Sequence, residues 1–343
     1  MKIAGFDIGG ANTDLAIVDF DKKGEITNIA TDFKYLPMWT SKKDLGDTLL
    51  SLINNITNLD SIDAVAITMT AELVDAYDTK KEGVLEIAKE VKDNFHIPTM
   101  FIGVNGVLSY EDLQKNPLDV AAANWIATAE IAGKMAENCI FVDTGSTTTD
   151  IIPVKNGHEC AKGRSDMGRL ATGELVYTGT LRTNISTFVD EIHLDGLSYK
   201  LASELFAISG DVYNVLGKIS MDEYSCDTPD GAGKSIEESK RRISRVLCAD
   251  LDTLSSKDLD KICEEIYKKQ VQQIMNGLDS VSKRENLDLV IATGFGKDIL
   301  AIPAARNLNL KVKSMNEFLT DDECVVAPAI GTTILVEEFL NFQ

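Results

Sequence analysis

The chain has little positive charge for its size. Its 343 residues include 34 Lys and Arg against 54 Asp and Glu, so the formal net charge is −20 at pH 7. Such a charge repels nucleic acids and anionic membrane surfaces. We therefore expect small-molecule substrates rather than either of these partners, and nothing in the sequence indicates an oligomeric state. Any bound phosphate must be held by backbone N–H groups, a few basic side chains and a divalent cation.

The sequence also lacks long apolar runs and paired cysteines. No apolar run approaches the roughly 18 residues of a membrane span, and the first residues lead into an acidic turn rather than a signal peptide, so we expect a cytoplasmic protein. The six cysteines show no C-x-x-C spacing, which favours reduced thiols over disulfides or a zinc site. Residues 158–160 resemble a set of metal ligands, but a surface turn after Asn156 and Gly157 accounts for them equally well.

Two glycine-rich turns, each at the end of an apolar run, dominate what is present. The first covers residues 6–14, FDIGGANTD, and the second covers residues 142–150, VDTGSTTTD. In both, an aspartate is followed by glycine, then by hydroxyl or amide side chains, and then by a second aspartate. Glycine lets the backbone turn sharply and approach phosphate oxygens closely. The pair predicts a duplicated device that binds a polyphosphate from both sides.

The apolar pattern around these turns predicts an α/β protein, and the chain length favours two domains. We expect hairpins at 2–20 and 139–155, helices at 44–59, 81–94 and 119–130, and strands at 64–69, 99–102 and 287–292. The helix at 119–130 is dense in alanine, which allows close packing between domains, and its Trp125 is expected in the core. A loop at 226–235, rich in Pro and Gly, is expected to move or to line a pocket.

Five segments in this order resemble the signature of the actin, sugar-kinase and heat-shock-chaperone superfamily. They are the two turns, the alanine-rich helix, a strand, turn and helix at 290–297, and a connecting segment at 327–336. The two turns are similar to those of the hydantoinase A and oxoprolinase branch. The resemblance implies an actin-like, ribonuclease H-like ATPase fold with a central cleft. It implies a first domain at 1–135 plus about 331–343, and a second at 136–330 with an inserted region at about 157–287.

Blocks at 164–166, 172–179 and 226–231 resemble a small archaeal and methylotroph subgroup tied to one-carbon metabolism. That resemblance implies an alkyl transferase of methanofuran biosynthesis. Such an enzyme joins the phenol oxygen of γ-glutamyltyramine to the methylene of an aminomethylfuran-methyl diphosphate and releases pyrophosphate. The alternatives are an ATP-dependent kinase or an amide hydrolase of the hydantoinase and oxoprolinase kind, and a nucleotide-gated regulator.

The candidate catalytic residues are Asp143, Glu72 and Arg164. A phenol titrates at a pH of about 10, so ether formation at neutral pH needs a base or a cation that stabilises the phenolate. Glu72, which follows the strand at 64–69, and Asp143 are the candidate bases. Arg164, Lys162 and Arg182 are the alternative cations.

The remaining site residues follow from the turns. Mg²⁺ is the expected cofactor, because aspartates that face phosphates would otherwise repel them, and ATP binding is left open. The candidate metal ligands are Asp7, Asp143 and Asp150, while Asp14 serves equally well to flank its turn. The candidate residues for binding a diphosphate or nucleotide are Gly9, Gly10, Asn12, Thr13, Gly145, Ser146, Thr147, Thr148, Gly294, Gly296 and Lys297.

Overall fold

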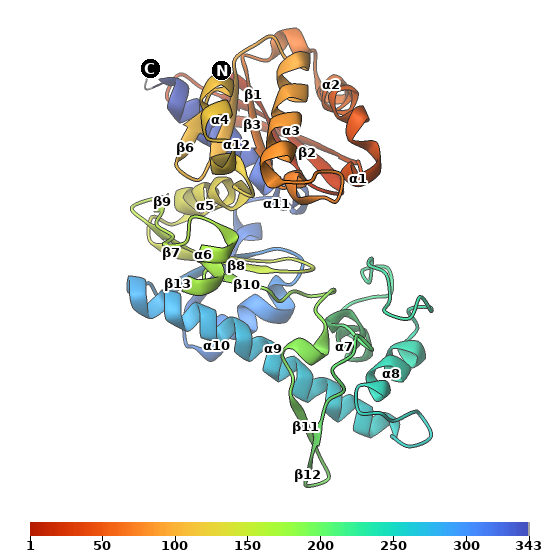
Figure 1. Cartoon of the computed structure of the whole chain (residues 1–343). Helices are drawn as coiled ribbons and strands as arrows, with labels where there is room; N and C mark the ends of the chain where they lie inside the picture. The colour runs from red at the N-terminus through yellow and green to blue at the C-terminus, as the bar shows by residue number, and fades with distance from the viewer. Residues whose placement is uncertain (342–343) are drawn as a thin grey trace.

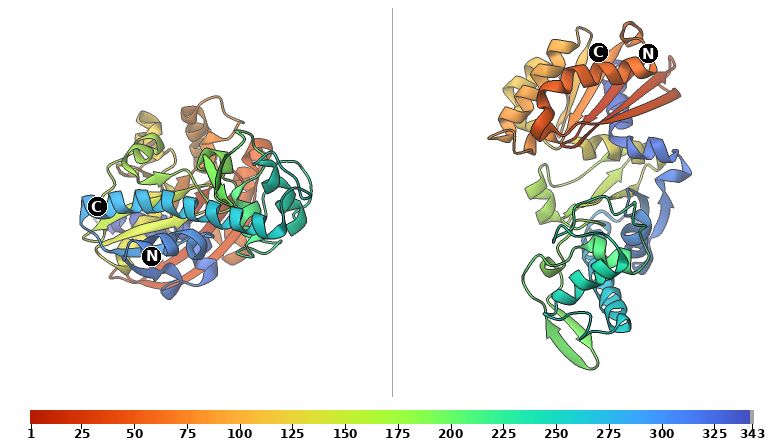
Figure 2. Two further views of the ribbon diagram at one scale, coloured as in Figure 1. Left: turned by 90° about the horizontal axis from the view of Figure 1, so that it is seen from below. Right: turned by 90° about the vertical axis from the view of Figure 1, so that its right-hand side faces the viewer.

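A computed structural model of the chain describes residues 1–341 and shows two lobes, each built around a six-stranded sheet (Figure 1). A side view shows the lobes one above the other, joined by a narrower waist (Figure 2). The first strand and the last helix both lie in the upper lobe of Figure 1. We propose that the domain boundary lies near residue 135, because the first sheet ends with Leu108 and the second begins with Cys139.

The first sheet has the strand order β3-β2-β1-β4-β5-β6. Its strands are β1 (Lys2–Ile8), β2 (Asn12–Phe20), β3 (Ile26–Tyr35), β4 (Ala64–Met69), β5 (Thr99–Gly103) and β6 (Gly106–Leu108). The expected hairpin of β1 and β2 is present, and β1 pairs in parallel with β4 on its other side. One face of this sheet buries Ile17 and Ile67 against the helices α2 (Leu45–Ile56) and α3 (Lys80–Asn94).

The second sheet repeats this arrangement. Its order is β10-β8-β7-β13-β14, with β9 paired to β8. The strands are β7 (Cys139–Thr144), β8 (Thr149–Lys155), β9 (His158–Glu159), β10 (Leu175–Val176), β13 (Leu289–Thr293) and β14 (Lys311–Ser314). As in the first lobe, β7 forms an antiparallel hairpin with the next strand and pairs in parallel with a later one, β13. The two expected phosphate turns therefore occupy equivalent places in the two sheets.

Two helices, α5 (Asn124–Met135) and α12 (Ala327–Asn341), cross between the sheets. A Cβ atom at Gly331 would collide with the backbone of Ala127, so the helices touch backbone to backbone, as the alanine-rich sequence predicted. Trp125 is 3% exposed and belongs to the core, as expected. The helix begins at Asn124 rather than at residue 119, because Pro117–Val120 forms a short 3₁₀ turn and Ala122 has a positive φ of 49°. The segment from 327 onward is itself helical.

The region at 157–287 forms most of the lower part of the second lobe (Figure 1). It contains α6 (Asp166–Thr172), the hairpin of β11 (Glu191–Leu194) and β12 (Leu197–Lys200), α7 (Ser209–Val215), α8 (Ile236–Arg245) and the 30-residue α9 (Ser256–Glu285). The remaining helices are α1 (Met38–Ser41), α4 (Tyr110–Lys115), α10 (Ile302–Asn307) and α11 (Asp321–Val325). Within residues 1–341, no helix is both long and apolar enough to cross a membrane. All six cysteines are free thiols.

Candidate functional site

The two glycine turns have the same backbone geometry. In the first, the N–H of Gly9 donates to the carbonyl of Asn12 at 2.9 Å. In the second, the N–H of Gly145 donates to the carbonyl of Thr148 at the same distance. The hydrogen bond fixes each turn as a tight loop at the end of its hairpin, so that the duplication seen in the sequence is also a duplication in structure.

Each turn holds two aspartates side by side at its base. Asp7 lies directly opposite Asp14 in the β1–β2 ladder, and Asp143 lies directly opposite Asp150 in the β7–β8 ladder. Opposed residues of a ladder point to the same face, with Cβ atoms roughly 5 Å apart, and like charges there destabilise the sheet. Each pair therefore requires a proton or a cation.

The first turn carries a strongly perturbed carboxyl group. Burial, reinforced by the negative charges of Asp14 and Glu72, raises the pKa of Asp7 to about 8, although the Asn124 amide acts in the opposite direction. Burial also raises the pKa of Asp14 to about 6. Both groups would be stabilised as anions by a cation at this turn.

The second turn also carries carboxyl groups with raised pKa values, but one of them has a cationic partner, Arg169. Burial and then the neighbouring Asp150 raise the pKa of Asp143 to about 7. Burial raises the pKa of Asp150 as well, while Arg169, which forms an ion pair with it, acts in the opposite direction. Arg169 is 4% exposed, also contacts Asp166 at 2.9 Å, and lies 4.7 Å above the ring centroid of Trp125.

Glu72 links the two turns across the cleft. It is 1% exposed, and burial raises the pKa of its carboxyl group to about 7, with Lys80 lowering this value and Asp166 of the other lobe raising it. Lys80 and Asp166 are themselves 4.0 Å apart. The electrostatic influence of one carboxylate on the next thus extends from turn to turn, and we call the six groups involved the carboxylate row: Asp14, Asp7, Glu72, Asp166, Asp150 and Asp143.

The chemistry of this row fits a divalent cation. Asp7 Oδ1 and both carboxylate oxygens of Glu72 are buried without a hydrogen-bond partner among residues 1–341, and buried charges of this kind need a counter-ion. Mg²⁺ prefers oxygen ligands and usually takes one or two carboxylates together with phosphate oxygens and water. No three His, Cys, Asp or Glu side chains of the described chain are gathered to hold a metal by themselves. A phosphate ligand would therefore complete the coordination.

The expected metal ligands and catalytic residues are only partly brought together. Asp7 and Asp143 belong to different turns, with Glu72 and Asp166 between them in the carboxylate row, whereas Asp150 is already neutralised by Arg169. Arg164 donates to Glu159 at 2.7 Å and to the carbonyl of Val104 in the first lobe. Its guanidinium group therefore joins the lobes, and the catalytic role expected from the sequence stays a prediction.

The side chains of the two turns differ in accessibility. Asn12 is exposed, and Ser146, Thr147 and Thr148 are half-buried. Thr13 is fully buried and lies opposite Ile8 in the ladder, on the face of the sheet turned away from Asp7. The role of Thr13 in binding phosphate therefore stays a prediction.

The segment at 179–182 supports the second turn. The backbone N–H groups of Leu181 and Arg182 both donate to the carbonyl of Ser146 at 2.9 Å. A Cβ atom at Gly179 would collide with the backbone of Thr147, so the segment lies directly against the turn. The sequence indicated the block at 172–179 and Arg182, but not their contact with this turn.

A hollow of about 440 Å³ opens beside Asp143. Its lining includes Gly294, Phe295, Lys297 and Asp321, so the turn that follows β13 forms part of its wall. Gly294 has a φ of 85°, and a Cβ atom there would collide with the Asp143 carboxylate. Asp143 therefore faces both the turn and this hollow.

A second hollow, of about 690 Å³, lies between the lobes. The first lobe contributes Ala11 of the first turn together with Tyr35 and Trp39. The second lobe contributes Arg182 and the loop at 225–229. The site thus consists of two turns, a row of carboxylates and two hollows, which suits a reaction between two small molecules, one of them phosphorylated.

Comparison with known proteins identifies the family. The model of the hydantoinase/oxoprolinase family matches residues 63–336. The chain belongs to the hydantoinase/oxoprolinase family. One family relative is the (4-{4-[2-(γ-L-glutamylamino)ethyl]phenoxymethyl}furan-2-yl)methanamine synthase of Methanocaldococcus jannaschii, which is 40% identical over 343 residues and 99% of each chain.

Solved structures confirm the expected fold of this hydantoinase/oxoprolinase family member. The nucleotide-free structure of acetone carboxylase matches 97% of this chain and 70% of its own, with a TM-score of 0.55 and 12% identity. A putative N-acetylmannosamine kinase of Listeria monocytogenes matches 100% of both chains, with a TM-score of 0.51 and 13% identity. At such identities the likeness concerns the two-lobed fold alone.

Proposed function

We propose that this protein is an alkyl transferase of methanofuran biosynthesis that forms an aryl ether. The observation that carries this proposal is the 40% identity to the M. jannaschii synthase over 99% of both chains. The compound in that synthase's name contains a phenoxymethyl group between a γ-glutamylaminoethyl unit and a furan methanamine. The bond to be made therefore joins the phenol oxygen of γ-glutamyltyramine to a methylene carbon on the furan.

The two turns support a diphosphate as the leaving group on that carbon. When the phenol oxygen forms its bond to the methylene carbon, the bond from carbon to the diphosphate oxygen breaks, and pyrophosphate leaves with the electron pair. The N–H groups of Gly9 and Gly145 already close their turns, so the adjacent backbone N–H of Gly10 is the one suited to bind the negative charge that develops there. Mg²⁺ bound at either turn, by Asp7 or by Asp143, would supply further neutralisation of that charge.

We assign the role of base to Glu72. Both of its carboxylate oxygens are buried and have no hydrogen-bond partner in the described chain, and it lies between the two turns. A carboxylate in that position can accept the phenol proton as the ether bond forms. Asp143 is less suited to this role, because it lies at the turn where the diphosphate is held.

The hollow beside Asp143 suits the furan end of the substrate. The furan ring donates electron density to the departing methylene, which gives the transition state cationic character and makes it sensitive to water. Phe295 is 41% exposed and lines this hollow, so its ring can cover the furan. Asp321 lines it as well and can bind the aminomethyl group as an ammonium ion.

The test is a reaction of purified protein with Mg²⁺, γ-glutamyltyramine and the furan diphosphate, without ATP. We expect release of pyrophosphate and the ether product in equal amounts, measured by a phosphate assay and mass spectrometry. A folded protein that forms no ether would contradict the proposal. ADP production that depends on substrate in a parallel reaction with ATP would favour a kinase or an ATP-dependent hydrolase instead.

A further inference from the structure

The hollow between the lobes has an aromatic wall fixed to the first turn. Tyr35 ends β3 and is 64% exposed, and Trp39 in α1 is 48% exposed. The backbone N–H of Leu36 donates to the carbonyl of Ala11, and that of Met38 donates to the carbonyl of Gly10, both at 2.8 Å. The two exposed rings are therefore held beside the turn, where an aromatic substrate can cover them.

The opposite wall carries one cation and one anion without partners. Arg182 and Asp227 are exposed, and neither side chain forms an ion pair or hydrogen bond with any residue in 1–341. A guanidinium group binds a carboxylate through two parallel hydrogen bonds, and a carboxylate binds an ammonium group. The pair is thus complementary to the zwitterionic end of an amino acid.

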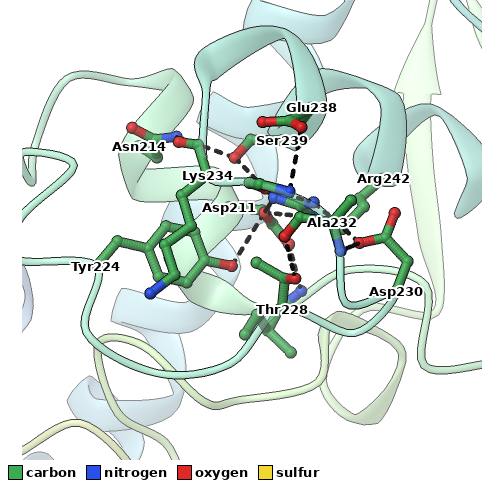
Figure 3. A network of polar contacts seen from close by, with 12 residues as sticks. Asp211, Asn214, Tyr224, Thr228, Asp230, Ala232, Lys234, Glu238, Ser239 and Arg242 are labelled. Atoms are coloured by element: carbon green, nitrogen blue, oxygen red, sulfur yellow. Dashed lines mark hydrogen bonds and ion pairs between the residues drawn. The ribbon is translucent and has the colours of Figure 1, made fainter.

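The loop that carries Asp227 is anchored to the interior rather than free. Figure 3 shows Arg242 between Asp211 and Asp230. Arg242 is fully buried, and it donates through Nε to Asp211 at 2.8 Å and through Nη1 to Asp230 at 3.1 Å. It also donates to the carbonyl of Gly233 at 3.0 Å. The loop at 226–235 was expected to move or to line a pocket, and these contacts support the second alternative.

Charge argues against a diphosphate in this hollow, and the volume suits a substrate-sized ligand. A diphosphate needs several cations, whereas the lining offers Arg182 and opposes it with Asp227. The volume of about 690 Å³ lies within the range of about 300–1,000 Å³ that is typical of sites for small-molecule ligands. An aromatic amino-acid derivative satisfies the rings, the cation and the anion together.

We propose that this hollow binds the acceptor substrate, an aromatic ring tethered to a free amino acid. The ring packs against Trp39 and Tyr35 near the first turn, the α-carboxylate binds Arg182, and the α-ammonium group binds Asp227. The assignment rests on the proposed function, which supplies γ-glutamyltyramine as the acceptor. The cluster of Asp211, Arg242 and Asp230 positions Asp227 through the loop.

The test compares γ-glutamyltyramine with tyramine, which lacks the glutamyl group. We expect Arg182→Gln and Asp227→Asn to raise the KM for γ-glutamyltyramine by about 10- to 100-fold and to change the kinetics with tyramine much less. Arg306→Gln, at an exposed arginine of α10 outside the hollow, serves as the matched control. Unchanged discrimination between the two acceptors in folded Arg182→Gln and Asp227→Asn would overturn the assignment.

Binding can also be followed without turnover. The chain has two tryptophans, of which Trp125 is buried and Trp39 is 48% exposed. We expect γ-glutamyltyramine to change the fluorescence of Trp39, and Trp39→Phe to abolish that change. An unchanged Trp39 fluorescence at saturating acceptor would contradict the inference.

The acceptor site and the proposed function can fail separately. If the wild-type protein forms no ether at all, the proposed function fails. If it forms ether but the variants keep their discrimination between γ-glutamyltyramine and tyramine, only the acceptor site fails.

Discussion

Arg169 neutralises Asp150 from inside the second lobe. The guanidinium group is 4% exposed and is held between Asp150 and Asp166. Asp14, the equivalent of Asp150 in the first turn, has no basic partner in the part of the chain that the structure describes. The turns are therefore alike in backbone but unlike in charge, and the first turn has the greater need of an external cation.

The raised pKa values of the buried carboxyl groups predict how stability depends on pH. Asp7, Asp143 and Glu72 have pKa values of about 8, 7 and 7 in the folded chain, whereas unfolded carboxyl groups titrate at about 4. Between these values the folded state binds more protons, so the free energy of unfolding falls as the pH rises. In EDTA we expect a lower Tm at pH 8 than at pH 5, measured by differential scanning fluorimetry. A Tm that rises from pH 5 to pH 8 would contradict this prediction.

Removing one charge from the row should have two opposite effects. We expect Asp7→Asn to raise the Tm in EDTA at pH 8, because it removes a buried anion, and to lower kcat/KM by about 100-fold or more through weaker metal binding. Mg²⁺ should raise the Tm of the wild-type protein at pH 8 but not that of the variant. Asp60→Asn, at an exposed position, is the control and should retain the Mg²⁺ response.

Glu72→Gln tests the assignment of the base. We expect kcat to fall by about 10²- to 10⁴-fold, the usual contribution of a general base, with little change in KM. Raising the pH towards 10 should restore part of the rate, because the phenol then ionises without help. Ether formation across this pH range is the measurement. A wild-type pH profile in Glu72→Gln would exclude the role.

Arg164 offers a test of structural against catalytic function. Since its side chain joins Glu159 to Val104, we expect Arg164→Gln to reduce the free energy of unfolding by about 1–3 kcal/mol. The kcat should stay within about threefold of the wild-type value if its role is structural. A large loss of kcat at an unchanged Tm would instead support the catalytic role that the sequence predicts.

The buried pair of Arg242 and Asp211 should be sensitive to removal of one partner. Arg242→Met leaves Asp211 buried without its cation, which we expect to cost about 3–5 kcal/mol. Adding Asp211→Asn should recover part of that loss, because the stranded charge is gone. Chemical denaturation of the single and double variants measures both changes. Equal stability of Arg242→Met and of the double variant would contradict the coupling between Arg242 and Asp211.

Local patterns explain which parts of the fold were predictable from the sequence. The hairpins around both turns depend on glycines and apolar runs that are adjacent in the chain, and they form as expected. The ten-residue β3 was missed because none of its side chains is buried, so that it shows no alternation of apolar and polar residues. The late start of α5 depends on the backbone at Ala122, which composition does not reveal.

The site was less predictable, because its parts meet across long stretches of sequence. The block at 172–179 was recognised, yet its Glu174 is fully buried and accepts backbone N–H groups from Lys162 and Gly163 while pairing with Arg284. Glu174 is therefore a structural brace. Similarly, Trp39 and Asp227 gave no signal as a pair, because only the folded chain brings them to one hollow.

The contact between Gly331 and Ala127 also fixes the spacing of the two helices beside the site. No side chain separates the two helix backbones there, so any side chain at position 331 would push them apart. Thr128 of α5 and Ala327 and Pro328 of α12 line the hollow beside Asp143. Widening of the helix pair would therefore change the shape of that hollow through a glycine that does not itself line it.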